Sequence, residues 1–260
     1  MCTVSWVFND GGYDLLVNRD ELRSRLHAEP PRRFAYPEGE RGGITLLAPV
    51  DGDAGGTWVS VNDAGLAICL LNRYPSREGV FASRGLLVRE LAVYTAVDEV
   101  VSRLQDKARE GLVYRPFTLL VLTPDSAPAI LLWDGELLAR ADLPDVPVLT
   151  SSSRLPVEVG PVRRRLWEQM FGQKGDALGL DDILAFHTSH DPERGARSPC
   201  MHREDARTVS LTHVRVTASS VAMAYADGPP CQAELGQPLT LIRRTTPLPR
   251  TLSPHAVPVV

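Results

Sequence analysis

The second residue of the chain carries the most reactive chemistry. Cys2 follows Met1, and because cysteine is small, removal of the methionine would leave Cys2 at the amino terminus. A cysteine there holds a thiol nucleophile and an α-amino group whose pKa lies near ~8, well below that of a lysine. Such an amine can take up the thiol proton, directly or through water. The sequence therefore predicts an N-terminal cysteine nucleophile.

Two charged residues follow where the chain is expected to return past Cys2. Residues 9–12 are Asn-Asp-Gly-Gly, which readily adopt the positive φ of a tight hairpin. This hairpin would bring Arg19 and Asp20 beside the thiol. Arginine stays charged and lowers the pKa of a nearby thiol, while a carboxylate can orient the amine. The alternative is a surface turn with an arginine–carboxylate pair.

A second group of reactive residues lies late in the chain. Cys200 and His202 follow His187 and His190, while Cys231 shows no partner. The two earlier histidines lack a carboxylate and a third ligand close by, so the sequence predicts no metal site and no cofactor. His202 is a candidate side chain for a substrate site, with a structural histidine as the alternative.

Composition limits the partners. The net charge of -4 argues against non-specific nucleic-acid binding, and the arginines at 163–165 are expected on a solvated face. The dense apolar run at 66–71 is far too short to span a membrane, and no signal peptide is apparent. Scattered cysteines favour a reduced, cytoplasmic protein. The oligomeric state stays open.

Strands and helices must position these residues. Apolar alternation and turn signals predict strands at 3–8, 13–18, 44–48, 57–62, 66–71, 117–122, 129–133, 137–141, 148–151, 208–217, 221–226 and 239–243. Helical periodicity predicts helices at 83–95, 97–110, 162–171 and 181–187, and a helical start at 22–31 that Pro30-Pro31 ends.

The order of these elements indicates the fold class. Strands, two helices, strands, two helices and strands follow one another, and hairpin-linked strands form antiparallel sheets. We expect an α+β arrangement of two packed sheets with helices outside. The chain is expected to be a single domain, 1–260, with an extended, proline-rich tail from about 246.

Several short motifs occur in a recognisable order over about residues 1–90. They are Met1-Cys2-Thr3, Asn18-Arg19-Asp20-Glu21, Gly55-Gly56-Thr57-Trp58, Asn62-x-x-Gly65-Leu66-Ala67, Asn72-Arg73 and Ser83-Arg84-Gly85-Leu86-Leu87. With them the chain resembles the NRDE family, also called the transport and Golgi organisation family. The resemblance implies an N-terminal-nucleophile hydrolase-like fold, a four-layer α-β-β-α sandwich. The first half of the chain is more distantly similar to the cysteine amidases that cleave penicillin V and conjugated bile acids.

The resemblance also implies roles for particular residues. Cys2 would be the nucleophile, Arg19 would support the thiolate, and Asp20 would hold the amine, with Glu21 as the alternative to Asp20. Asn72 would supply an oxyanion-hole side chain, a kind of donor worth ~3 kcal/mol in a comparable hydrolase.

Two positions depart from the family pattern. Where the amidases and many family members have an asparagine, this chain has serines, of which Ser152 is the candidate substitute. The late catalytic arginine is best matched by Arg207, with Arg203 as the alternative. Tyr74 and Phe81, in the loop after Asn72, are expected to line the substrate pocket.

The implied function is hydrolysis or acyl transfer at a carbon–nitrogen amide bond of a small substrate, without a cofactor. The alternative is a non-enzymatic carrier of haem or lipid that keeps the fold. In that case Cys2 or His202 would act as a ligand.

Overall fold

Two antiparallel sheets and four helices make up the described part of the chain, residues 2–36, 43–76, 79–174 and 178–244 of this computed structural model. Sheet A contains β1 (Cys2–Asn9), β2 (Gly12–Leu22), β10 (Val148–Ser151), β11 (Ala206–Val216), β12 (Ser220–Ala226) and β13 (Leu239–Ile242). Its spatial order is β10-β1-β2-β11-β12-β13.

Sheet B takes its strands in sequence order from the middle of the chain. They are β3 (Glu29–Ala35), β4 (Thr45–Val50), β5 (Val59–Asn62), β6 (Ala67–Asn72), β7 (Phe117–Thr123), β8 (Ser126–Trp133) and β9 (Leu138–Ala141). The helices are α1 (Arg84–Leu91), α2 (Val97–Glu110), α3 (Val159–Phe171) and α4 (Leu180–Thr188).

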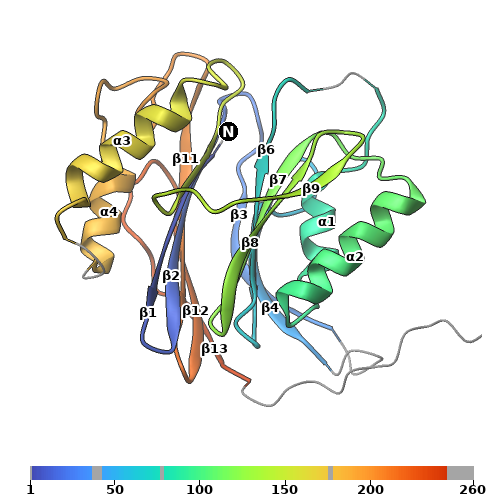
Figure 1. Cartoon of the computed structure of the whole chain (residues 1–260). Helices are drawn as coiled ribbons and strands as arrows, with labels where there is room; N and C mark the ends of the chain where they lie inside the picture. Colours follow the sequence, from blue (N-terminus) through green and yellow to red (C-terminus); the bar gives the residue numbers. More distant parts are fainter. Residues whose placement is uncertain (1, 37–42, 77–78, 175–177, 245–260) are drawn as a thin grey trace, which may run out of the picture.

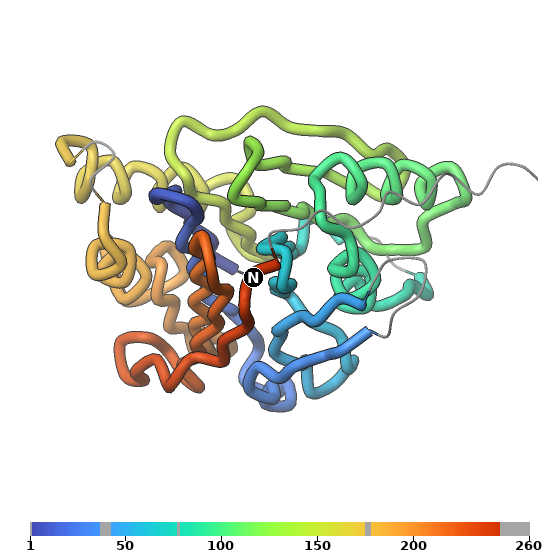
Figure 2. Tube along the Cα trace, turned by 90° about the horizontal axis from the view of Figure 1, so that it is seen from below, coloured from blue at the N-terminus to red at the C-terminus, as the bar shows by residue number. Residues whose placement is uncertain are grey.

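The elements stack in four layers. The inner faces of the two sheets share one apolar core, which includes Trp6 and Tyr13 from sheet A and Leu122 from sheet B. Helices α1 and α2 cover the outer face of sheet B, and α3 and α4 cover that of sheet A (Figures 1 and 2). The predicted α-β-β-α sandwich is confirmed.

Strand β1 shows how the sequence divides between these layers. Successive side chains of a strand point to opposite faces. Cys2, Val4 and Trp6 accordingly pack between the sheets, whereas Thr3 and Ser5 are also buried but do not join that core. The Ser5 hydroxyl lies 2.7 Å from His187 Nε2 on α4, and burial lowers the pKa of that histidine to about 3. The outer face of β1 is therefore polar and paired with the helix layer.

The first hairpin forms as predicted. Asn9 pairs with Gly12 across a turn in which Gly11 has φ 75°, a conformation that glycine adopts without steric cost. The same register places Cys2 opposite Arg19. On its other side, β1 pairs with β10, so β1 is an interior strand.

Two expectations about secondary structure were wrong. Residues 22–31 do not begin a helix. The strand β3, Glu29–Ala35, instead contains both Pro30 and Pro31. This strand lies at the edge of sheet B, where a missing N–H interrupts no interior ladder. Helix α1 ends at Leu91, before the predicted Thr95. The tail from about 246 lies outside the described residues.

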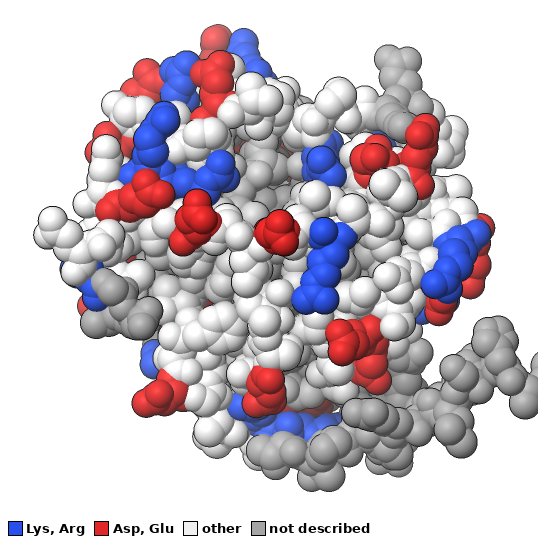
Figure 3. Space-filling view, in the orientation of Figure 1, with Lys and Arg blue, Asp and Glu red and all other residues white. Residues whose placement is uncertain are grey.

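On the face seen in Figure 3, charged side chains of one sign do not gather in a single large patch. Acidic and basic side chains are interspersed there over both halves of the molecule. Among the described helices, none is both long and apolar enough to cross a membrane.

Candidate active site

Cys2 begins β1 at the point where three strands run side by side. Its backbone N–H donates a hydrogen bond of 3.0 Å to Ser151 Oγ on β10, while Arg19 lies opposite it on β2. The thiol side faces the core between the sheets, where Cys2 packs in one cluster with Leu71 of β6. Only 7% of Cys2 is exposed, and this burial raises the pKa of the thiol. The positive charge at the amino end of the chain and Arg19 both act to lower that pKa.

Arg19 is held by groups from sheet B. Its guanidinium donates a short hydrogen bond to Asp51, just after β4, and lies 4.4 Å from the centre of the Trp58 ring. A second arginine, Arg25, donates to the same carboxylate at 2.7 and 2.9 Å. Part of the charge of Arg19 is therefore neutralised by Asp51, which limits its effect on the thiol.

The indole of Trp58 offers a donor in this region. Its Nε1 is buried and makes no hydrogen bond with any residue that the structure describes. The rest of the side chain belongs to the apolar core between the sheets.

Asp20 lies on the opposite face of β2 from Arg19. It accepts a 2.6 Å hydrogen bond from the Thr208 hydroxyl, and Arg163 on α3 lies 3.8 Å from its other oxygen. Burial raises the pKa of the Asp20 carboxyl, while Arg163 opposes that rise. The carboxylate therefore lies on the face of β2 that is covered by helix α3, one residue past the Cys2–Arg19 pair.

Arg163 was expected on a solvated face, and this expectation was wrong. Its side chain is 1% exposed and donates to Thr3 Oγ1 on β1, to the Arg197 carbonyl at 3.2 Å and to the Ala196 carbonyl at 3.3 Å. It thus ties α3, β1, β2 and the loop between α4 and β11 together. Periodicity alone gave no sign that one of three adjacent arginines turns inward.

A β-bulge turns Thr208 toward Asp20. Thr208 pairs with Asp20 and Ser210 with Arg19, so two residues of β11 are spanned by one step of β2. In a regular strand Thr208 and Ser210 would share a face. The extra residue shifts Thr208 to the face of Asp20, an effect that bulges near functional sites often have.

Asn72 ends β6 on the other side of the core. Its side chain hydrogen-bonds with Tyr74, whose pKa is raised by burial and lowered by this bond. Leu71, the residue before Asn72, packs in the same core cluster as Cys2. Phe81 lies farther along the loop, with the Arg115 guanidinium 5.5 Å from its ring centre. Asn72 therefore ends the strand whose Leu71 packs in the cluster of Cys2, whereas Phe81 has a separate contact.

Ser151 ends β10 and Ser152 follows it, and their hydroxyls make different contacts. Ser152 Oγ accepts a 3.1 Å hydrogen bond from the backbone N–H of Leu155 and so stabilises the turn after the strand. Ser151, one residue earlier, is the serine in contact with Cys2. The hydroxyl that contacts Cys2 therefore belongs to Ser151 and not to the expected Ser152.

Arg207 and Arg19 share a pocket of about 180 Å³ between β2, β11, β12 and the chain leading to β3. Glu21, opposite Arg207 in the sheet register, also lines it. The guanidinium of Arg207 makes no hydrogen bond or ion pair with the described residues, whereas that of Arg203 is paired with Asp205. Of the two alternatives for the late arginine, Arg207 is therefore the one that lines this pocket.

His202 lies in a different group from Cys2. Its Nε2 is 3.5 Å from Cys200 Sγ and 3.3 Å from Cys231 Sγ, and its ring centre is 5.1 Å from that of His190. Burial lowers the pKa of His202 to about 4. Cys231, which has no apparent partner in the sequence, has one in the fold.

Solved structures share this architecture. A variant of conjugated bile acid hydrolase from Clostridium perfringens superimposes with a TM-score of 0.59 at 13% identity, covering 94% of this chain and 98% of that one. A Caenorhabditis elegans ortholog of N-acylethanolamine-hydrolyzing acid amidase gives a TM-score of 0.52 at 9% identity, covering 82% and 92%. The fold is therefore that of the N-terminal-nucleophile hydrolases.

The sequence identifies the family within that class. Residues 1–141 match the Transport and Golgi organisation 2 family, and the chain belongs to it. No curated protein matches the chain in sequence. The matched segment contains β1, β2 and all of sheet B, whereas β10, α3, α4 and β11 to β13 lie outside it.

Proposed function

We propose that the protein is an N-terminal cysteine amidase or acyltransferase acting on a small substrate. The observation that carries the proposal is the position of Cys2, whose nitrogen is bonded to Ser151 while its thiol faces Arg19 and the core. Two neighbours with this fold are named for the hydrolysis of conjugated bile acid and N-acylethanolamine, which are amides. The chain would act as one domain, because both sheets contribute to the core that holds Cys2.

The proposed reaction follows from the groups around Cys2. The thiol attacks the amide carbonyl, and its proton passes to the α-amine that loss of Met1 exposes. The amide N–H of Asn72 donates to the oxyanion as the tetrahedral intermediate forms. Collapse breaks the carbon–nitrogen bond, and the leaving amine takes the proton from the α-amine. Water, or a second amine in acyl transfer, then attacks the thioester and restores the thiol.

The surroundings of Asp20 support its role as the group that orients the amine. The carboxylate is fixed by Thr208 and balanced by Arg163, so it has one arrangement beside the start of β1. Glu21 instead faces the pocket that Arg207 lines. We therefore assign Asp20, rather than Glu21, to the amine.

Arg207 is proposed to bind the substrate. A guanidinium without a partner among the described residues is suited to a carboxylate or another anionic group. A panel of N-acyl amides with neutral and anionic amine portions, followed by amine release, tests the proposed function. Turnover of at least one member supports it, and preference for anionic members supports the role of Arg207.

Removal of Met1 is the first requirement of this mechanism. We expect protein made in a cell with methionine aminopeptidase to begin at Cys2, because the enzyme accepts small second residues. Intact-mass measurement decides this. An active preparation that retains the methionine would rule out the amine as the proton acceptor.

Replacement of Arg19 tests the electrostatics of the thiol. Since Arg19 lowers the pKa of Cys2, Arg19→Ala should raise it and shift the pH profile of iodoacetamide alkylation at Cys2 to higher pH. Mass spectrometry of the modified peptide measures the profile. Arg25→Ala is the matched control, because Arg25 shares Asp51 but does not lie opposite Cys2. Equal shifts in both variants would mean that the arginines act only through the local structure.

A further inference from the structure

Four metal-ligating side chains meet outside the group around Cys2. They are His190, Cys200, His202 and Cys231, and one ligand atom of each lies within 4.8 Å of all the others. His190 and the next two come from the loop between α4 and β11, and Cys231 from the segment after β12. Residues 1–141, which match the family, contain none of them.

The spacing of these atoms fits a tetrahedral ion. Zinc bonds of about 2.3 Å to sulfur and 2.0–2.1 Å to nitrogen place a nitrogen and a sulfur ligand about 3.5 Å apart in a tetrahedron. The single atom His202 Nε2 lies 3.5 Å from Cys200 Sγ and 3.3 Å from Cys231 Sγ. One nitrogen thus approaches two sulfurs at once, as two edges of such a tetrahedron require.

His190 supplies an independent observation. Its Nε2 is buried and makes no hydrogen bond with any described residue. A buried polar atom without a partner is costly, and native proteins seldom keep one unless water or an ion satisfies it. Its ring stands at 71° to that of His202, with the ring centres 5.1 Å apart. Two imidazoles at this separation can direct their nitrogens to one point.

We propose that His190, Cys200, His202 and Cys231 bind one Zn²⁺ ion. Two thiolates and two imidazoles form a closed set of ligands, which is typical of structural zinc and leaves no open position for a substrate. The sequence predicts no metal site here, because His187 and His190 lack a close pattern of a carboxylate and a third ligand in the chain. The four ligands are spread over 42 positions, counted from 190 to 231. Only the fold brings them together.

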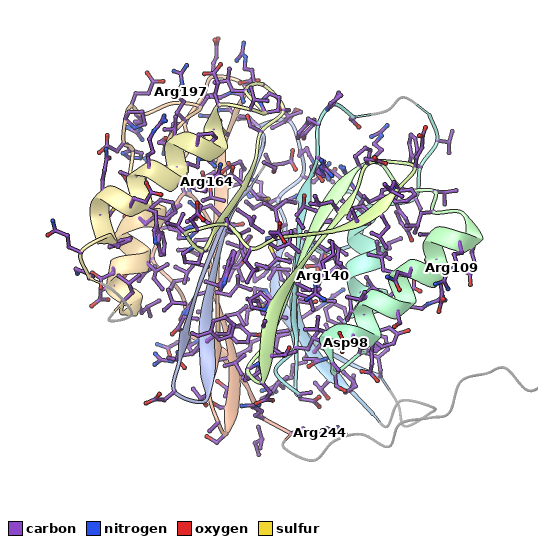
Figure 4. The ribbon with its side chains drawn as sticks, viewed as in Figure 1. Asp98, Arg109, Arg140, Arg164, Arg197 and Arg244 are labelled. Atoms are coloured by element: carbon purple, nitrogen blue, oxygen red, sulfur yellow. The ribbon has the colours of Figure 1, made fainter. Side chains whose placement is uncertain are left out.

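The ion would fasten the loop that supports Asp20. Met201 lies between two of the ligands, and its N–H donates a 2.8 Å hydrogen bond to the Thr208 hydroxyl. That hydroxyl donates in turn to Asp20 at 2.6 Å. Earlier in the same loop, the carbonyls of Ala196 and Arg197 accept from Arg163; Figure 4 labels Arg197, which is also paired with Glu158 beside the start of α3. Zinc would therefore hold the hydrogen-bond chain to Asp20 in place.

Metal analysis of the full-length, tag-free protein tests the proposal without any substrate. We expect about one zinc per chain after dialysis, and cobalt substitution should give the visible absorption of tetrahedral thiolate-bound Co²⁺. Removal of zinc by a chelator under reducing conditions should lower the Tm by roughly 10 °C, and Zn²⁺ but not Mg²⁺ should restore it.

Variants locate the ion. Cys200→Ser combined with Cys231→Ser should lose at least nine-tenths of the zinc, whereas Cys69→Ala, which removes a buried thiol of β6, should keep it. If the double variant does not fold, the cobalt spectrum of the wild-type protein still decides. Wild-type protein that contains no zinc and takes up none under reducing conditions would overturn the proposal. So would a Cys200–Cys231 disulfide in freshly purified protein. None of these outcomes depends on the proposed amidase activity.

Discussion

Cys2→Ala should abolish acyl transfer while leaving the fold intact. In the proposed mechanism the sulfur attacks the carbonyl, so its removal should bring activity below the limit of detection. The backbone N–H that binds Ser151 remains, and the loss of one sulfur at a buried strand end should cost only about 1 kcal/mol of unfolding free energy. Rates on whichever amide proves to be a substrate, together with thermal melting, measure both effects.

Serine and a second cysteine provide the controls. Cys2→Ser keeps an oxygen nucleophile of much higher pKa, so a small fraction of the activity should survive. Cys69→Ala removes another buried thiol of the same core and should stay active. Full activity in Cys2→Ala would refute the assignment of Cys2 as the nucleophile.

Arg163→Met should cause the largest loss of stability among single arginine changes in α3. The guanidinium is the positive partner of the buried Asp20 and donates to three other groups. Removing one partner of a buried ion pair typically costs about 3–5 kcal/mol, which corresponds to roughly 10 °C in Tm for a chain of this size. Arg165→Met, an exposed position on the same helix, should change stability by no more than about 0.5 kcal/mol.

The loss in Arg163→Met should depend on pH. Arg163 lowers the pKa of Asp20, so its removal raises that pKa further above the unfolded value. A carboxyl with a raised folded-state pKa binds its proton more tightly when folded, and stability therefore falls as the pH rises toward that pKa. The Tm difference from wild type should be greatest at neutral pH and narrow as the pH is lowered. A difference that is constant with pH would show that lost packing, rather than the charge of Asp20, causes the instability.

The layers of the fold could be predicted because their signals are local. Residues 9–12 specify a tight turn, and the alternation of β1 and β2 then fixes which residues meet across it, including Cys2 and Arg19. The boundaries of α2 followed from periodicity and from Gly111, whose φ of 93° ends the helix in the left-handed region. The proline pair of β3 led to the wrong prediction of a helix that ends there. Prolines are tolerated in a strand at the edge of a sheet, and nearby residues do not reveal that β3 lies at an edge.

The orientation of the polar site residues could not be predicted in the same way. One extra residue in β11 decides that Thr208 faces Asp20, and alternation along the strand would assign it to the other face. Ser151 and Ser152 differ by the same single step. Arg163 turns inward because a buried carboxylate lies there, which depends on residues more than a hundred positions away. Long-range pairing of polar groups leaves little trace in local periodicity.

The interior position of β1 sets the time at which the amino terminus can be processed during synthesis. Sheet B is contiguous in sequence from residue 29 to 141, but β10 begins at Val148 and β11 at Ala206, so sheet A cannot close around Cys2 until these segments leave the ribosome. At typical translation speeds of about 5–20 residues per second, this delay is on the order of ten seconds. Because Cys2 itself is almost fully buried in the finished sandwich, we expect the processing that the proposed function requires to take place on the nascent chain in that interval.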